Sequence, residues 1–467
     1  MSDATTSLTA PTDSAAPSRR PTLFLLPGLG LGGDVFGAVS RRLDEHFESV
    51  PLSLPGFGGT DTLAGTAVDD MVAFVLRRIR EHGASSWLLV GHSMGGKIAT
   101  LVARRALDGE PGVFGLRGVV LLAGSPPSPE PMDESRRDEM LGWAVDGPLG
   151  ADAAREFIDG NVGAPLEATD DALVTADLLR ASPEAWTAWL TRGSREDRAS
   201  EVGELDVPAL IVAGGADGDL GAEAQRLLNG PVYPGARFET LAAAGHLLTL
   251  ERPAEVADAI LRLWREHAGL GPAVPDDVAR TIASGRTSSR TRAIFARRIL
   301  ADDPEYRPRV LSAGQLGILR SLARRAVPQD GVELDLAARI DAGLADGASD
   351  GWRNAALPPD DVAYRQALDD LADFDGLTEA EQDARIGEIV AESFEAPGGH
   401  LTAAQLNLWF EDCRVDLVRL WLSHPATMAR IGFDGYANGG DLVRIQGFIR
   451  LRAGEREEWE PMQGARR

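Results

Sequence analysis

The sequence is poor in the residues that build metal centres and disulfides. Its 467 residues include one cysteine, Cys413, which excludes an intramolecular disulfide and a cysteine-based metal site. The seven histidines are scattered, and none lies three to five residues from another, the spacing of many metal ligands. The sequence therefore predicts no metal and no other cofactor.

Long apolar runs are also missing. No run approaches the ~18 residues that a membrane-spanning helix needs. Arg19-Arg20 looks like the twin arginine of an export signal, but the apolar run that follows, residues 23–26, is too short for such a signal. A first β-strand explains this run better, and we expect a cytoplasmic protein.

Basic charge is scarce. The chain has 47 Lys and Arg against 71 Asp and Glu, a net charge of −24. Such a surface repels phosphate backbones and anionic lipids, so neither nucleic acid nor membrane is an expected partner. The rest of the composition, 44% hydrophobic and 25% charged, is typical of a soluble globular protein.

From residue 22 onward, short apolar runs alternate with amphipathic stretches of helical period. The runs are 22–26, 50–54, 87–90, 118–122, 209–213 and 237–241. Buried strands that alternate with helices predict an α/β fold, a parallel sheet covered on both faces. Between about 126 and 203 the strands stop and apparent helices rich in tryptophan follow, which is typical of a cap.

Composition divides the chain into four parts. Residues 1–20, rich in Ser, Thr, Ala and Pro, are predicted to be a disordered tail. The α/β domain follows at 21–268, then a linker at 269–290 that begins with a Gly- and Pro-rich stretch. Residues 291–467 show helical patterns without strand-like runs, so we expect a mostly α-helical C-terminal domain.

The strongest chemical signal is the pentapeptide Gly91-His92-Ser93-Met94-Gly95. It follows an apolar strand and precedes a helical stretch, the context of a G-x-S-x-G nucleophile elbow. The tight turn needs small residues two positions before and after the serine, and it lifts the hydroxyl clear of the sheet. Ser93 is therefore the predicted nucleophile.

A serine hydroxyl needs a base, and in this fold the acid and then the base follow in chain order. His246 comes just past the last predicted strand and is the predicted base. Asp217 and Asp219 both follow the preceding strand, and we favour Asp217 because it comes first. The acid would fix the imidazole tautomer and stabilise its charged form.

The oxyanion hole needs two backbone donors. The N–H of Met94 is one, because it starts the helix after the serine, and the N–H of Leu29, in the loop after the first strand, is the other. A substrate pocket is expected beside them, and its candidates are His92, Trp143, Trp186 and Trp189. Packing in the core is the alternative role for each of these four side chains.

Residues 21 to about 268 resemble the α/β-hydrolase superfamily, in particular its small cofactor-free esterase-like members. The resemblance rests on the elbow, on the order of the triad and on Pro55-Gly56-Phe57-Gly58, and it implies an α/β-hydrolase fold with a helical cap. Many members have His where Pro27 stands here. A serine at the elbow implies cleavage of an ester, thioester, lactone or C–C bond.

The C-terminal domain resembles the gluconate 2-dehydrogenase small-subunit (subunit 3) family. The similar segments are 311–328, 338–341, 402–413, 423–425 and 431–433. Members of that family are accessory subunits of a flavoprotein, so the resemblance implies a flavin dehydrogenase as partner.

The sequence therefore predicts a serine hydrolase, an esterase or lactonase that forms an acyl-enzyme, fused to an accessory domain. The rival hypothesis is a non-catalytic scaffold or accessory subunit of an oxidoreductase complex. The complete triad in chain order argues against the rival.

Overall fold

The computed structural model describes residues 20–348 and 354–441. The tail predicted over residues 1–20 lies outside this range except for Arg20, and so does the end of the predicted helical domain beyond residue 441.

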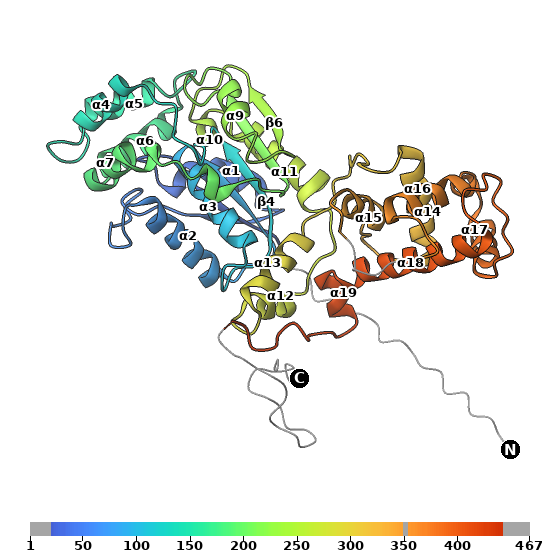
Figure 1. The fold of residues 1–467 in the computed structure, drawn as a ribbon. Coiled ribbons are helices and arrows are strands. Elements are labelled where there is room, and N and C mark those ends of the chain that lie inside the picture. Colours follow the sequence, from blue (N-terminus) through green and yellow to red (C-terminus); the bar gives the residue numbers. More distant parts are fainter. Residues whose placement is uncertain (1–19, 349–353, 442–467) are drawn as a thin grey trace, which may run out of the picture.

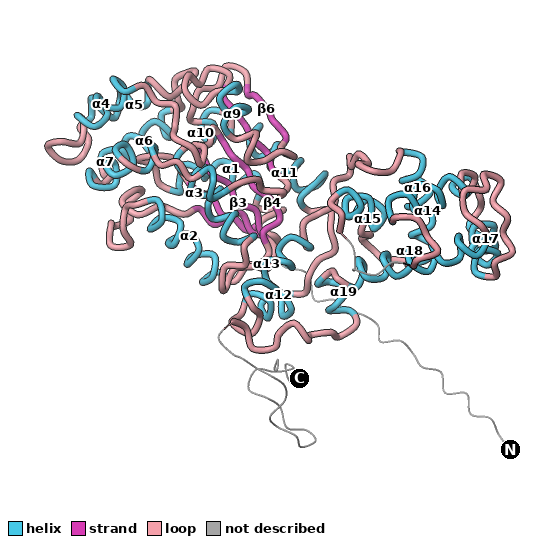
Figure 2. Tube along the Cα trace, in the orientation of Figure 1, coloured by secondary structure: helices cyan, strands magenta, loops and turns pink. Residues whose placement is uncertain are grey.

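All the strands of the described residues lie in the N-terminal domain and form one parallel sheet (Figure 2). The strand order is β2-β1-β3-β4-β5-β6. The strands are β1 (Thr22–Leu26), β2 (Glu48–Pro51), β3 (Trp87–His92), β4 (Leu116–Leu122), β5 (Ala209–Gly214) and β6 (Arg237–Leu241). Five overlap closely with the predicted runs, whereas β2 lies two to three residues earlier than its run.

The four inner strands β1, β3, β4 and β5 are buried at every residue. A strand buried on both faces needs cover on both, and helices supply it. They are α1 (Gly37–Leu43), α2 (Val68–His82), α3 (Met94–Leu107), α9 (Ala222–Leu228), α10 (Leu248–Glu251) and α11 (Pro253–Leu263). The predicted fold class, α/β with a parallel sheet, is confirmed.

The segment predicted as a cap contains only helices. They are α4 (Glu134–Gly142), α5 (Ala151–Asp159), α6 (Ala168–Leu179), α7 (Pro183–Thr191) and the short α8 (Ala199–Val202). Figure 1 shows α4–α7 together on the side of the N-terminal domain that faces away from the C-terminal helices.

The described C-terminal residues are helical. The helices are α12 (Asp276–Ala283), α13 (Ser289–Arg298), α14 (Ala313–Ala326), α15 (Leu336–Ala345), α16 (Asp360–Asp370), α17 (Glu379–Val390), α18 (Ala403–Leu422) and α19 (Pro425–Arg430). Hydroxyls of Ser312, Thr378 and Thr402 cap α14, α17 and α18 in capping boxes, which satisfy N–H groups at each start.

The predicted linker is partly structured, since α12 lies inside it. Helices α12 and α13 pack on the N-terminal domain, where Arg292 donates from Nη1 to the carbonyl of Gly109 at 2.8 Å. Helices α14–α18 build a separate hydrophobic core. Residues up to Leu300 therefore contribute to the core of the N-terminal domain, and the separate core begins at Leu311.

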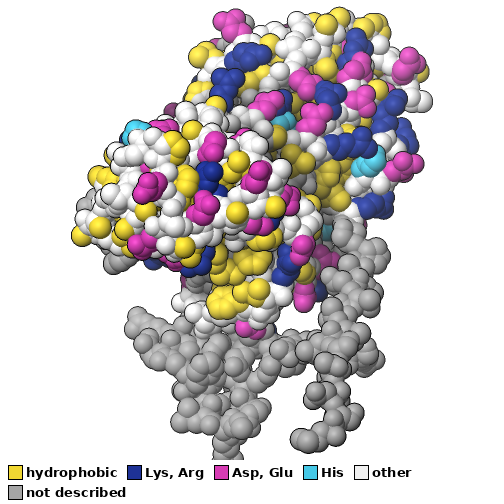
Figure 3. All heavy atoms as spheres, turned by 90° about the vertical axis from the view of Figure 1, so that its right-hand side faces the viewer, with side chains coloured by type: hydrophobic (Ala, Val, Ile, Leu, Met, Phe, Trp, Pro, Cys, Tyr) yellow, Lys and Arg dark blue, Asp and Glu magenta, His cyan; other side chains and the backbone are white. Residues whose placement is uncertain are grey.

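Two properties of the molecule bear on partners. None of the helices within 20–348 and 354–441 is long and apolar enough to span a bilayer. On the face of the molecule drawn in Figure 3, acidic and basic side chains are interspersed. The net charge of −24 is therefore not expressed there as one acidic surface.

Candidate active site

Parallel strands place four loops at one edge of the sheet. Leu26 at the end of β1 lies opposite Gly91 of β3, and Gly214 of β5 lies opposite Leu241 of β6. The loops that follow these strands carry the predicted oxyanion donor, nucleophile, acid and base. Sites in open α/β sheets form at this carboxyl edge.

Ser93 occupies a strained turn between β3 and α3. Its φ is 50° and its ψ −124°, a conformation that L residues rarely adopt. The glycines around it are required by contact: a Cβ on Gly91 would lie 2.4 Å from the Gly95 carbonyl, and one on Gly95 would lie 2.4 Å from the Leu26 carbonyl. The chain therefore forms the turn that the pentapeptide predicts, with the Ser93 side chain partly exposed.

Asp217 and His246 form a hydrogen-bonded pair. Asp217 Oδ2 lies 2.7 Å from His246 Nδ1, and the side chains are 5% and 12% exposed. Burial raises the pKa of Asp217, but the charge and hydrogen bond of His246 outweigh it and lower the pKa. Burial lowers the pKa of His246, but the charge and hydrogen bond of Asp217, with smaller contributions from Glu130 and Asp219, outweigh burial and raise the pKa. The pair thus favours a carboxylate beside an imidazole that readily accepts a proton.

Asp219, the alternative acid, makes no hydrogen bond to His246. Burial, and then the negative charge of Asp217, raise the pKa of its carboxyl. Of the two candidates left open by the sequence, Asp217 is the one bound to the histidine.

Ser93 and His246 are not hydrogen-bonded to each other. They are neighbours through His92, whose Nε2 lies 2.8 Å from the backbone oxygen of His246. Hydrogen bonds of catalytic residues are often long in unliganded enzymes and shorten when substrate binds.

The two predicted oxyanion donors have free N–H groups. Met94 is the first residue of α3, so its N–H has no partner within the helix. Across the described ranges, neither Met94 nor Leu29 donates any other backbone hydrogen bond. Leu29 lies between Gly28, where a Cβ would stand 2.9 Å from Ser93 Cβ, and Gly30, which has a φ of 79°.

The predicted pocket side chains are spread over two environments. His92 is fully buried beneath Ser93. In the cap, the rings of Trp143 and Trp186 lie 6.2 Å apart, and Trp186 donates from Nε1 to the Met140 carbonyl at 2.8 Å. A Cβ on Gly30 would lie 3.1 Å from the Trp186 ring, so this indole borders the oxyanion loop.

Trp189 is also buried, and its ring lies 5.8 Å from the ammonium of Lys97. Lys97 is fully buried on α3 and donates to the carbonyls of Gly193 and Glu196, at 3.0 and 2.9 Å. Lys97 therefore ties the end of the cap to the helix that starts at the nucleophile. No motif in the sequence indicates this role.

The cap also reaches the base. The Asn161 carbonyl accepts hydrogen bonds from the N–H groups of His246 and Leu247, at 2.8 and 3.2 Å. The carboxylate of Glu251 accepts from Gly163 N at 2.8 Å and from Gly245 N at 3.0 Å. Asn161 and Glu251 were not predicted as site residues, because pairing with Leu247 or Gly163 across so many positions leaves no local pattern in the sequence.

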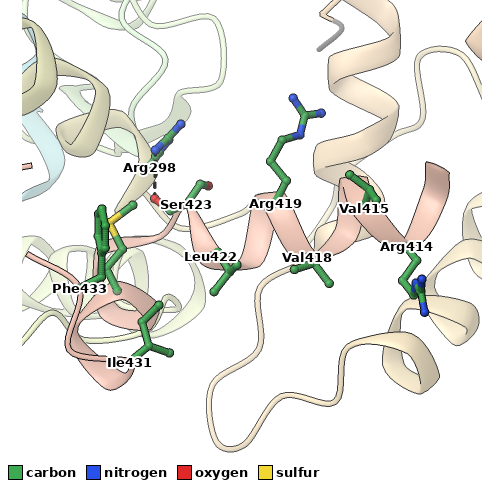
Figure 4. Close-up of a pocket in the computed structure, with 10 residues that line it drawn as sticks. Arg298, Arg414, Val415, Val418, Arg419, Leu422, Ser423, Ile431 and Phe433 are labelled. Carbon is green, nitrogen blue, oxygen red and sulfur yellow. Dashed lines mark hydrogen bonds between the residues drawn. The ribbon is translucent and has the colours of Figure 1, made fainter. Parts of the chain in front are cut away.

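A second hollow lies in the helical domain, along α18. This groove encloses about 800 Å³ and is lined mainly by apolar side chains. Val418 and Leu422 project from α18 toward Ile431, whereas the guanidinium of Arg419 points away from them (Figure 4).

No group of three or more His, Cys, Asp or Glu among residues 20–348 and 354–441 could hold a metal ion.

Comparison with known proteins covers mainly the N-terminal domain. The sequence model of the Alpha/beta hydrolase family matches residues 23–259. The 2-succinyl-6-hydroxy-2,4-cyclohexadiene-1-carboxylate synthase of Serratia proteamaculans is 30% identical over 205 residues, which are 42% of this chain and 78% of that protein. The pimeloyl-[acyl-carrier protein] methyl ester esterase of Sodalis glossinidius is 32% identical over 205 residues, 42% of this chain and 75% of that protein.

A third relative is much longer. Polyketide synthase ThaQ of Burkholderia thailandensis is 30% identical over 297 residues, which are 61% of this chain. The chain spans only 14% of the length of that synthase.

Proposed function

This chain belongs to the alpha/beta hydrolase family, and we propose that it cleaves a carboxylic ester, thioester or lactone through an acyl-enzyme on Ser93. It is a hydrolase of the esterase type, as the family and the esterase relatives indicate. The residue roles and the covalent intermediate are the proposal. The observation that carries them is a serine at a strained elbow beside a buried His246–Asp217 pair.

The proposed reaction proceeds in two halves. Ser93 Oγ attacks the carbonyl carbon while His246 takes its proton, and Asp217 stabilises the imidazolium. The N–H groups of Leu29 and Met94 hold the oxyanion. His246 returns the proton to the leaving alcohol or thiol, and the acyl group stays on Ser93. Water, deprotonated by His246, then releases the acid and restores the serine.

The substrate class rests on chemistry and on one relative. The Sodalis protein, by its name, is an esterase for the methyl ester of a pimeloyl group on an acyl-carrier protein. In the cap, the partly buried Trp143 packs against Trp186, and Trp186 packs against Phe157; both of these partners are buried, and such an apolar cap supports an apolar acyl group. We therefore propose an apolar acyl ester, with thioesters and lactones as further members of the same panel.

For residues 291–467 we propose a binding role without chemistry. The apolar groove along α18 supports such a role, since exposed apolar hollows often bind partners. The flavin dehydrogenase implied by the resemblance to the gluconate 2-dehydrogenase small subunit is the partner to test. A flavoprotein should co-purify with the full chain and with Ser93→Ala, but not with a chain truncated after residue 290. Equal capture by the truncated chain would reject this partner.

The hydrolase proposal is tested by turnover. The wild type and Ser93→Ala are compared on p-nitrophenyl esters of increasing chain length, on matching thioesters and on lactones. We expect hydrolysis by the wild type and a loss of several orders of magnitude in the variant, because the nucleophile is gone. Equal turnover by both proteins would reject Ser93 as nucleophile.

A further inference from the structure

The imidazole of His92 lies where three loops of the site meet. Its Nε2 is 2.8 Å from the backbone oxygen of His246, and the two rings are 5.2 Å apart. On another side, a Cβ on Gly28 would lie 3.1 Å from His92 Nδ1. The residue itself is part of the nucleophile elbow. One buried ring therefore touches the loops of the base, the oxyanion donor and the nucleophile.

The hydrogen bond fixes the tautomer of His92. A carbonyl oxygen only accepts, so Nε2 carries the proton and donates. Nδ1 is then the unprotonated nitrogen, and it has no hydrogen-bond partner among residues 20–348 and 354–441. Burial, followed by the charge of His246, lowers the pKa of His92 to about 3. The ring is thus neutral at physiological pH and adds no positive charge beside the base.

The main chain of His246 is held from two directions. Its N–H donates to the carbonyl of Asn161 in the cap at 2.8 Å, and its carbonyl accepts from His92. The Leu248 N–H also reaches this carbonyl, at 2.9 Å. Among the hydrogen bonds of the described residues, the one from His92 is the bond that connects the base directly to the turn that carries Ser93.

We propose that His92 is a positioning residue, which sets the distance between the base loop and the nucleophile by hydrogen-bonding the backbone of His246. This inference rests on the proposed function, in which His246 accepts the proton of Ser93. His92 touches no reacting atom in this account. Its effect is on the aim of the His246 ring, and misplacement of a catalytic group by about 1 Å can cost roughly 100-fold in rate.

Three variants separate this role from simple packing. In His92→Gln, the side-chain N–H₂ extends far enough to replace Nε2–H as donor to the His246 carbonyl. In His92→Asn, the amide is polar but too short to reach it. His92→Leu fills the space without a donor. Thermal unfolding of each variant reports the loss of stability separately.

The first readout is the change of kcat and the change of KM, measured separately for each variant on a short p-nitrophenyl ester. In His92→Asn and His92→Leu we expect kcat to fall about 10- to 100-fold with KM nearly unchanged, since the hydrogen bond affects the chemical step more than binding. His92→Gln should retain most of the wild-type kcat. Equal kcat in Gln and Asn at equal folded fraction would overturn the proposal.

A second readout does not need turnover. The proton shared by His246 Nδ1 and Asp217 should give a strongly deshielded proton NMR signal, assigned by its loss in Asp217→Asn. We expect the signal to be sharp in the wild type and in His92→Gln, and to be broadened by exchange with water in His92→Asn and His92→Leu. If no ester is hydrolysed, the proposed function fails while this comparison still tests His92. An unchanged signal in all variants would overturn the positioning role.

Discussion

Asp217 Oδ2 lies 2.7 Å from His246 Nδ1, although the two residues follow different strands. Asp217 comes after β5 and His246 after β6, and these strands are parallel neighbours at the edge of the sheet. Asp219, the other aspartate that follows β5, is two residues away in the chain and makes no such hydrogen bond. This contrast makes the two aspartates a matched pair for experiment.

We expect Asp217→Asn to lower kcat by about 10³- to 10⁴-fold, because an amide favours the wrong imidazole tautomer and cannot stabilise the imidazolium. Asp219→Asn should change kcat by less than about tenfold, since its side chain does not touch His246. Steady-state kinetics on one activated ester measure both. A larger loss of kcat in Asp219→Asn than in Asp217→Asn would show that Asp219, and not Asp217, is the catalytic acid.

The pH dependence follows from the state of His246. The neutral ring is the active form, so kcat/KM falls as pH drops through the pKa of His246. Burial lowers that pKa, but the charge and hydrogen bond of Asp217 outweigh burial and raise it. The acid limb of the kcat/KM profile should therefore have its midpoint above the ordinary histidine value. A midpoint below that value would mean that burial dominates instead.

Gly28 is a steric test of the oxyanion loop. A Cβ there would lie 2.9 Å from Ser93 Cβ, closer than real Cβ contacts. We expect Gly28→Ala to shift the loop that carries Leu29 and to lower kcat by about 10²- to 10³-fold, the usual effect of losing one oxyanion donor. Gly142→Ala is the control, because a Cβ at that position meets nothing within 4 Å. Equal kinetics for the two variants would remove Leu29 from the oxyanion hole.

Glu251 is expected to join the cap to the base. Its carboxylate accepts hydrogen bonds from Gly163 of the cap and Gly245 beside the base. Glu251→Ala leaves both N–H groups without this partner, so we expect a loss of about 1–3 kcal/mol in the free energy of unfolding. The variant should also have a lower kcat, because His246 is less well held.

Two comparisons complete that experiment. Glu251→Gln keeps one acceptor oxygen and should have intermediate stability. Asp258→Ala, on the exposed side of α11, should behave as the wild type in urea unfolding and in kinetics. A Glu251→Ala protein with wild-type kcat would show that the cap bridge does not position the base.

Much of the fold could be predicted because buried strands leave a local pattern. The run at 22–26 matches the fully buried β1 residue for residue. The run at 237–241 matches β6 equally well, although this edge strand has no fully buried residue. The run at 50–54 is displaced from the other edge strand, β2 (Glu48–Pro51), because the buried apolar residues Leu52 and Leu54 follow the end of that strand. Helix α12 lies in the predicted linker, because the boundary of that linker follows from Gly and Pro content alone.

The catalytic residues of the site could be predicted from the sequence, whereas the contacts that hold the cap could not. Ser93, His246 and Asp217 sit at positions that strand ends dictate, so motif and order were enough to propose them. The hydrogen bond from His246 N to Asn161 joins residues that are 85 positions apart, and Lys97 reaches Gly193 across 96 positions. Such pairs depend on how the cap docks, which no local pattern records.

The most direct test of the account is reaction with a fluorophosphonate probe, followed by intact-protein and peptide mass spectrometry. The proposed activation of Ser93 by His246 predicts one adduct per chain, located on Ser93, and none in Ser93→Ala. His246→Ala should fold as the wild type does, but it should react with the probe far more slowly. A wild-type protein that stays unlabelled while its activated-ester turnover continues, or an adduct on another residue, would contradict the claim that Ser93 is the nucleophile.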